Sequence, residues 1–182
     1  MGMLIINLVS AYGVFGIFGL YTIFVLVPML VSGLVEHALG IDAYFQRIFI
    51  DAVLPLHLNL DFKDFVHTVL FFPLLEEVVF RAVPLTLLGV PGLIIGSVVW
   101  VFMHPAWQLD YLATAELGTK ASFMILDLMF YGLSAVFYGI LWVTGAGLIA
   151  IIIHMFHNAW VTIASRHSTA TIYTQSRFVK HR

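Results

Sequence analysis

Long apolar runs, interrupted by only a few charged residues, constrain this chain most. Of its 182 residues, 62% are hydrophobic and 10% are charged, whereas a soluble domain carries about 25% charged residues. A helix of roughly 20 apolar residues crosses a bilayer, so the sequence has room for about five crossings and none for a separate water-exposed domain. These features exclude a soluble globular protein. They predict an all-α fold, a polytopic membrane bundle of about five transmembrane helices, with the lipid bilayer as its surroundings.

The predicted crossings are separated by Gly, Pro or short polar links. They cover residues 10–34, 65–88, 92–107, 121–143 and 146–165. Residues 36–64 mix charged and apolar side chains, which predicts an interfacial amphipathic segment followed by a loop. We expect residues 1–182 to form a single membrane-embedded domain with a basic tail at 166–182.

The basic residues predict an orientation, because cytoplasmic loops of membrane proteins carry an excess of Lys and Arg. If the tail is cytoplasmic and the crossings alternate, every Lys and Arg except Arg81 falls on the cytoplasmic side. These residues are Arg47, Lys63, Lys120, Arg166, Arg177, Lys180 and Arg182. The prediction is a multi-pass integral membrane protein with its N-terminus outside and its C-terminus in the cytoplasm.

Two absences exclude whole classes of function. The chain has no cysteine, so disulfides, a thiol nucleophile and a thiolate zinc site are ruled out. Its formal charge of -2 supplies no basic surface, so nucleic acid is not expected as a partner.

Three charged residues lie where the bilayer should be. Glu76, Glu77 and Arg81 fall inside the second predicted crossing, in "FFPLLEEVVFRAVPLTLL", and each would cost about 2.5–3.5 kcal/mol at mid-bilayer. Glu77 and Arg81 are four residues apart and share a helix face, whereas Glu76 points about 140° away from Arg81. Glu77 can therefore pair with Arg81, and Glu76 remains for a task such as general base. The plainer alternative is an Arg–Glu pair that only staples helices together.

Histidines mark two further crossings. His104 ends the third in "WVFMHPAW", and the fifth contains "IIIHMFHNAW", in which His154 and Asn158 are four apart and share a face. An asparagine that faced lipid would lack hydrogen-bond partners, so this face should look inward. Glu76, His104 and Asn158 each lie twelve residues from the outer end of their crossing, about 18 Å deep, and His154 lies one turn shallower. The depths predict one buried polar site.

The aromatic residues near the polar positions have simpler interpretations. Trp107, Tyr111 and Trp142 are typical of side chains that anchor helices at the membrane interface. Trp100 is interpreted as pocket wall or core.

These motifs resemble the intramembrane CAAX prenyl protease and bacteriocin-processing family, also called the CPBP or Abi family. "EEVVFR" matches its EExxxR motif, "WVFMH" its FxxxH motif and "HMFHN" its HxxxN motif, in order and on successive crossings. The resemblance covers 65–165, the expected catalytic core. The sequence departs from the pattern at Trp100, which replaces a Phe, and at Ala82, where a Gly commonly follows the Arg.

The resemblance implies hydrolysis of a peptide bond inside the membrane. Glu76, aided by His104, would hold and deprotonate the attacking water. His154 and Asn158 would form the oxyanion hole, and Glu77 and Arg81 would orient the site. The expected substrate is a membrane-associated peptide or protein. Because the chain is shorter than the eukaryotic CAAX proteases, we expect a prokaryotic cell-membrane protein for which a prenylated CAAX substrate is less favoured.

A metal is the main mechanistic alternative. Glu76, His104 and His154 could ligate zinc, with water in the fourth position. The histidines lack the i, i+4 pairing of an H-E-x-x-H helix, and Asn158 stands where a second ligand would be. The sequence therefore favours catalysis by glutamate without a cofactor, with zinc left open.

Two other functions compete with proteolysis. A non-proteolytic membrane protein of the same family, such as a bacteriocin immunity or binding protein, could keep the fold, although it would not need all four of Glu76, His104, His154 and Asn158. A proton-coupled transporter could also use buried Glu, His and Arg. The sequence shows none of the inverted repeats that such transporters commonly have.

Overall fold

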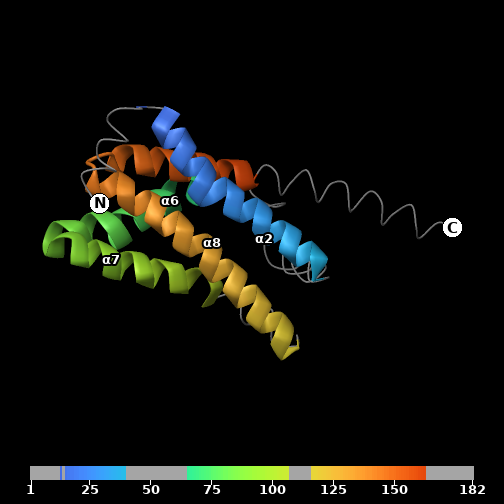
Figure 1. The fold of residues 1–182 in the computed structure, drawn as a ribbon. Coiled ribbons are helices and arrows are strands. Elements are labelled where there is room, and N and C mark those ends of the chain that lie inside the picture. Colours follow the sequence, from blue (N-terminus) through green and yellow to red (C-terminus); the bar gives the residue numbers. More distant parts are fainter. Residues whose placement is uncertain (1–12, 14, 40–64, 107–115, 163–182) are drawn as a thin grey trace. The chain divides into compact units, whose positions relative to one another are not determined.

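The computed structural model describes residues 13, 15–39, 65–106 and 116–162, and nearly all of them are helical (Figure 1). No strand occurs in these ranges, which confirms the all-α fold class. The chain divides into two units that interleave in the sequence. The first comprises Met1–Asp42 and Glu76–Ala150, and the second Ala43–Leu75 and Ile151–Arg182. The predicted loop and most of the amphipathic segment, the basic tail, Trp107 and Tyr111 lie outside the described residues.

The helices follow the predicted crossings closely. In chain order they are η1 (Thr22–Leu26), α2 (Val27–Ala38), η3 (His67–Phe71), α6 (Phe72–Glu77), η4 (Val78–Ala82), α7 (Val83–Ala106) and α8 (Leu117–Val143), then a helix over Gly147–Thr162. Three continuous stretches within the described ranges are long and apolar enough to span a membrane: Phe15–Val35, His67–Ala106 and Leu117–Val143. The last helix is shorter. Together they make the protein an integral membrane helical bundle.

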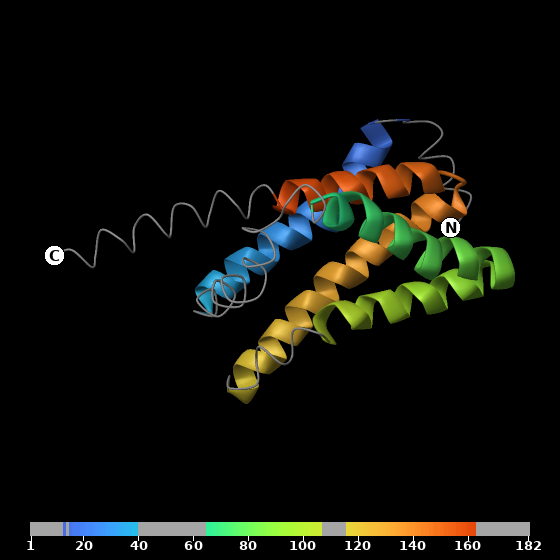
Figure 2. The ribbon, with the colours of Figure 1, turned by 180° about the vertical axis from the view of Figure 1, so that it is seen from behind.

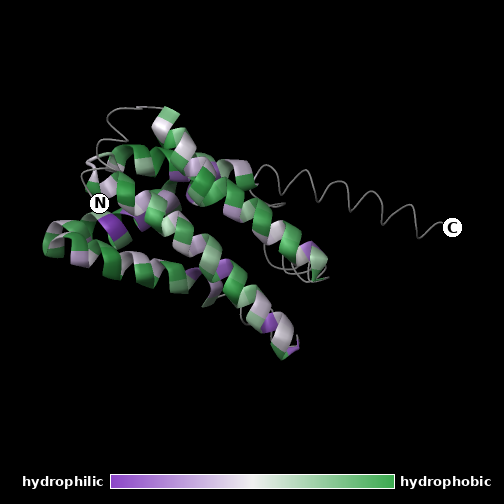
Figure 3. Cartoon of the chain, in the orientation of Figure 1, coloured by the Kyte–Doolittle hydropathy of each residue, from purple (hydrophilic) through white to green (hydrophobic). Residues whose placement is uncertain are grey.

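The outer faces of these helices are apolar, as lipid contact requires. Leu34, Leu87 and Leu148 are each at least 70% exposed. Figure 3 shows hydrophobic residues along α2, α7 and α8, with few hydrophilic positions between them.

A π-helical turn precedes a proline at three places in the described helices. The turns η1, η3 and η4 each end two residues before a proline, and the residue just before that proline donates its N–H to the carbonyl five residues back. The donor and acceptor pairs are Val27 and Thr22, Phe72 and His67, and Val83 and Val78. Proline lacks an N–H and clashes with the carbonyl four residues back, and a wider turn relieves the clash. The crossings therefore continue through Pro28, Pro73 and Pro84.

Helix α7 folds back on itself at Gly89. This residue has φ 65° and ψ −151°, a conformation that is essentially restricted to glycine. The turn joins one arm, η4 with residues 83–88, to a second arm at 90–106. Figure 2 shows the two arms running antiparallel. The predicted second and third crossings are thus the arms of a helical hairpin.

Two glycines on the second arm fix the register of the hairpin. A Cβ at Gly92 would clash with the carbonyl of Pro84, and a Cβ at Gly96 with the carbonyl of Phe80. The contacts are four residues apart on both arms, so small residues allow the backbones to approach closely along one seam. Continuing the same register by one turn brings Glu76 opposite Trp100.

Substitution of the seam glycine is expected to destabilise the protein. Gly96→Ala forces the new methyl group against the backbone carbonyl of Phe80 and should cost about 1–3 kcal/mol, as overpacking does elsewhere. Gly132→Ala on α8 is the matched control, because its Cβ would have no neighbour within 4 Å. Thermal unfolding in detergent should show a lower Tm for Gly96→Ala alone. Equal Tm values for the two variants would mean that the arms have room to separate.

Helix α8 packs against both α7 and the η1–α2 segment. Tyr21 meets Phe137 edge to face, with ring centroids 5.6 Å apart, and the buried core of this unit includes Phe123, Phe137, Tyr138 and Leu141. The helix begins at Leu117, earlier than the predicted residue 121. The cause is backbone bonding, since Lys120 N–H already donates to the Glu116 carbonyl at 3.0 Å.

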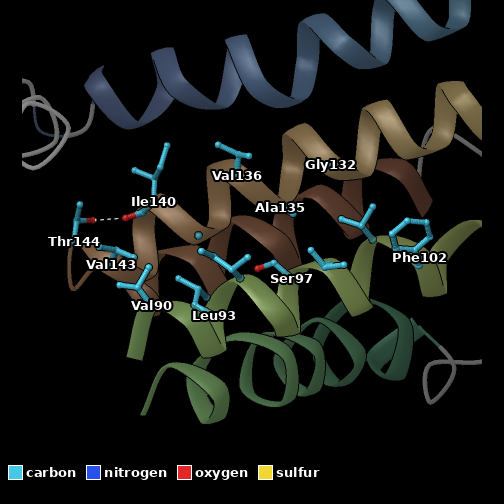
Figure 4. A pocket seen from close by; sticks show the side chains of 14 residues that line it. Val90, Leu93, Ser97, Phe102, Gly132, Ala135, Val136, Ile140, Val143 and Thr144 are labelled. Atoms are coloured by element: carbon cyan, nitrogen blue, oxygen red, sulfur yellow. Dashed lines mark hydrogen bonds between the residues drawn. The ribbon is translucent and has the colours of Figure 1, made fainter. Parts of the chain in front are cut away.

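An apolar cavity of about 490 Å³ lies between α7 and α8. Figure 4 shows Leu93 and Ser97 of α7 and Ala135 and Val136 of α8 along it. None of the sequence-predicted site residues lines this cavity. The candidate active site therefore lies elsewhere in the fold.

Candidate active site

Glu77 and Arg81 form a fully buried ion pair. Arg81 Nη1 lies 2.8 Å from Glu77 Oε1, and both side chains are 0% exposed. The second carboxylate oxygen of Glu77 accepts a hydrogen bond from the indole N–H of Trp142 at 2.7 Å. The predicted i, i+4 pairing is confirmed. Trp142, for which the sequence predicts an interface position, binds a buried carboxylate through its N–H; the interface position stays a prediction.

Aromatic faces cover the rest of the Arg81 guanidinium. Its Cζ lies 4.4 Å from the ring centroid of Trp100 and 5.1 Å from that of Tyr138. Nε and Nη2 have no hydrogen-bond partner among the described residues. Cation–π attraction compensates in part for the lost hydration and is worth about 2 kcal/mol when desolvated. Arg81 is thus held by one anion and two rings.

Glu76 is held by the second arm of the hairpin. Trp100 Nε1 donates to Glu76 Oε2 at 2.7 Å, which is a short distance of the kind expected for a charged acceptor. The same oxygen lies 3.8 Å from His104 Nε2. The Glu76 side chain is 25% exposed and the His104 side chain 21%. Both groups are therefore accessible to a small molecule.

The backbone sets the tautomer of His104. Its Nδ1 lies 2.8 Å from the carbonyl oxygen of Trp100, and a carbonyl can only accept, so Nδ1 carries the proton. In the neutral ring Nε2 is then an acceptor. The ring is fixed between Trp100 and Tyr131, with centroids 4.3 Å and 4.4 Å away. His104 thus presents Nε2 beside Glu76.

The second unit contains the other predicted pair. His154 is 4% exposed, and Asn158 donates its amide N–H to the carbonyl of Thr68 at 3.2 Å. In a regular helix the Thr68 carbonyl would accept from the N–H of Phe72. Here that N–H bonds to the carbonyl of His67, and the next residue, Pro73, has no N–H to offer instead. Asn158 therefore satisfies a carbonyl that the proline leaves without a backbone partner.

The amide of Asn158 still has a second N–H with which it could serve an oxyanion. That His154 and Asn158 join Glu76 and His104 in one site stays a prediction, since the two pairs belong to different units.

The described residues were predicted to include the ligands of a possible zinc ion. No three His, Asp or Glu side chains are grouped closely enough among them to hold a metal ion. Zinc ligation by Glu76, His104 and His154 stays an untested alternative.

Sequence reasoning missed the two tryptophans that bind the carboxylates. Trp100 meets Glu76 across 24 residues of sequence and Trp142 meets Glu77 across 65. A usable signal was present, because a buried indole seeks an acceptor for its N–H and buried carboxylates are the strongest acceptors in these helices.

The chain also matches a known protein family. Residues 59–160 match the family described as type II CAAX prenyl endopeptidase Rce1-like, and the match covers more than half of the chain. The chain belongs to this family. No curated protein and no solved structure matches it. The matched segment contains Glu76, Glu77, Arg81, His104, His154 and Asn158, and membership makes the protein a relative of CAAX-type intramembrane proteases.

Proposed function

We propose that the protein is an intramembrane endopeptidase that hydrolyses a peptide bond in a membrane-associated peptide or protein. The observation that carries the proposal is the pairing of Glu76 with His104, whose Oε2 and Nε2 atoms lie 3.8 Å apart. The family to which the chain belongs supports the peptide bond as the target.

The gap between these atoms suits a water molecule. At 3.8 Å the pair is too far apart for a direct hydrogen bond, and one water about 2.8 Å from both atoms would bridge it. Such a water is oriented by two acceptors, the carboxylate of Glu76 and Nε2 of neutral His104. Its lone pair then points away from both groups toward a substrate carbonyl.

Hydrolysis proceeds by direct attack of this water. As the new C–O bond forms, one water proton passes to Glu76, and the carbonyl oxygen becomes an oxyanion. Glu76 then delivers the proton to the amide nitrogen as the C–N bond breaks. The products are a carboxylic acid and an amine, and no covalent enzyme intermediate is formed.

His154 and Asn158 supply the oxyanion hole in this proposal. A ring N–H and the second amide N–H are donors of the kind that stabilises developing negative charge, and one such donor contributes about 10²–10³ in kcat. The bond from Asn158 to Thr68 fixes the amide plane. Glu77 and Arg81 orient the arm that carries Glu76.

Zinc is the alternative way to activate the water. Glu76, His104 and His154 would hold it. His104 Nδ1 already bonds to the Trp100 carbonyl, and zinc-bound histidines commonly make such a bond with the ring nitrogen that does not bind the metal. Zinc would act as a Lewis acid on the bound water.

Cleavage of a panel of peptides tests both the proposed protease activity and its dependence on a metal ion. Purified protein is incubated with fluorogenic transmembrane peptides and prenylated CAAX peptides, with and without prior chelation. We expect the cleavage rate after chelation to stay within twofold of the rate without the chelator. Loss of activity on chelation, with recovery on addition of zinc, would replace the glutamate mechanism by a zinc mechanism. Failure of folded protein to cleave any peptide would favour a non-proteolytic binding role.

A further inference from the structure

Trp100 is the residue in which this chain departs most clearly from its family motif, and it contacts three of the site residues of the first unit: Glu76, Arg81 and His104. The residue is 2% exposed. Its N–H bonds Glu76, its ring lies over Arg81, and its carbonyl accepts from His104. The phenylalanine of the FxxxH motif offers a ring face and a backbone carbonyl, but its side chain has no N–H.

The indole of Trp100 contacts a cation with its ring face and an anion with its ring edge. The face of an aromatic ring is negative and attracts a cation, whereas its edge is positive. Arg81 lies over the face at 4.4 Å from the centroid, and Glu76 lies at the N–H on the edge, 2.7 Å away. The ring therefore contacts the cation and the anion at the same time and keeps each at its own side.

Without the N–H, Glu76 has a competing partner. Arg81 Nε and Nη2 make no hydrogen bond to any described residue, and a carboxylate gains more from a guanidinium than from a neutral imidazole. Glu76 and Arg81 lie five residues apart, about 140° around an ideal helix, so the flexible Glu76 side chain would have to swing through that angle to reach the guanidinium. In that orientation its carboxylate would leave the position 3.8 Å from His104.

We propose that Trp100 is a positioning residue that, through its indole N–H, holds the Glu76 carboxylate toward His104 and away from Arg81. This inference rests on the proposed function, because it concerns the geometry in which Glu76 activates water. It predicts that an aromatic ring without the N–H is not enough for full activity, although such a ring would still fill the space and contact Arg81.

The decisive experiment removes the N–H and keeps the ring. Trp100→Phe is compared with wild type for peptide cleavage, and Trp160→Phe is the matched control because Trp160 is 64% exposed. We expect kcat to fall about 10- to 100-fold with KM within twofold, as for an interaction that matters only in the transition state. The control should match wild type. Replacement of Trp100 by 3-benzothienylalanine, which has the indole shape with sulfur in place of N–H, should give the same loss even if Trp100→Phe folds poorly.

A spectroscopic measurement tests the bond independently of activity. The chain has four tryptophans, so ¹⁵N-tryptophan labelling gives four indole N–H signals, and Trp100→Phe assigns one of them. Glu76→Gln should move that signal, whereas Glu116→Gln, at an exposed position, should leave it in place.

The outcomes separate the two proposals. Full activity of the benzothienyl variant, with cleavage still dependent on Glu76, would overturn the positioning role and leave the protease intact. An indole N–H signal that does not move in Glu76→Gln would also overturn the positioning role. Absence of cleavage by the wild type would overturn the proposed function, and the inference with it.

Discussion

Glu76→Gln is expected to abolish peptide cleavage, lowering kcat by about 10³-fold, while the protein stays folded. Glutamine has the same shape and its amide oxygen can still accept the Trp100 N–H that bonds Oε2. It cannot take a proton from water at neutral pH, and general base catalysis contributes about 10²–10⁴ in rate. The measurement is kcat on the best peptide of the panel.

Glu116→Gln is the control for this substitution. It makes the same chemical change at an exposed residue before α8, and its kcat should equal that of the wild type. If Glu76→Gln retains more than a tenth of wild-type activity, Glu76 is not the base. If both variants lose activity equally, the loss comes from a general effect on folding.

Arg81→Met is expected to destabilise the protein by about 3–5 kcal/mol, the largest stability effect among the substitutions considered. Methionine removes the cation from Glu77, whose side chain is 0% exposed, and an unpaired buried charge is costly. The free energy of unfolding is measured by denaturant titration in detergent micelles. Lys120→Met near the start of α8 should change it by about 1 kcal/mol or less.

A double variant distinguishes the ion pair from packing. In Glu77→Gln/Arg81→Met the buried charge is gone, while the glutamine oxygen can still accept the Trp142 N–H that bonds Glu77. The double variant should regain at least half of the stability lost by Arg81→Met. A double variant as unstable as the single one would show that the stacked guanidinium stabilises by its shape rather than its charge.

Local rules predicted much of this fold. The apolar runs placed the helices within a few residues, because a helix in lipid must satisfy its backbone internally and its length is set by the bilayer. The i, i+4 rule paired Glu77 with Arg81 and separated Glu76 from that pair, and the ion pair in the structure is the predicted one.

Non-local contacts were beyond these rules. The register of the hairpin depends on Gly92 and Gly96 meeting the carbonyls of Pro84 and Phe80, and nothing in a helical period states which glycine faces which carbonyl. The bond from Trp100 to Glu76 follows from that register. Once the seam is known, the bond could have been derived, because the next turn of each arm brings these two residues together.

The prolines carried information that helical periodicity does not use. Each of three prolines lies two residues beyond a π-helical turn. The turn before Pro73 leaves the Thr68 carbonyl without a backbone donor, and Asn158 supplies the missing N–H. A residue chosen from the sequence for catalysis thus also has a structural bond, which physical reasoning about Pro73 could have suggested.

The central claim is that a water activated by Glu76 and His104 attacks the peptide bond directly. Single-turnover cleavage in H₂¹⁸O is the most direct test of this claim. Excess protein is mixed with the best peptide substrate, and both the product and the intact protein are examined by mass spectrometry during the reaction. The expected result is one ¹⁸O atom in the new carboxyl group and no protein species heavier by a peptide fragment. Accumulation of a covalent peptide–protein adduct would contradict direct attack by water and would move the nucleophile to a side chain of the protein.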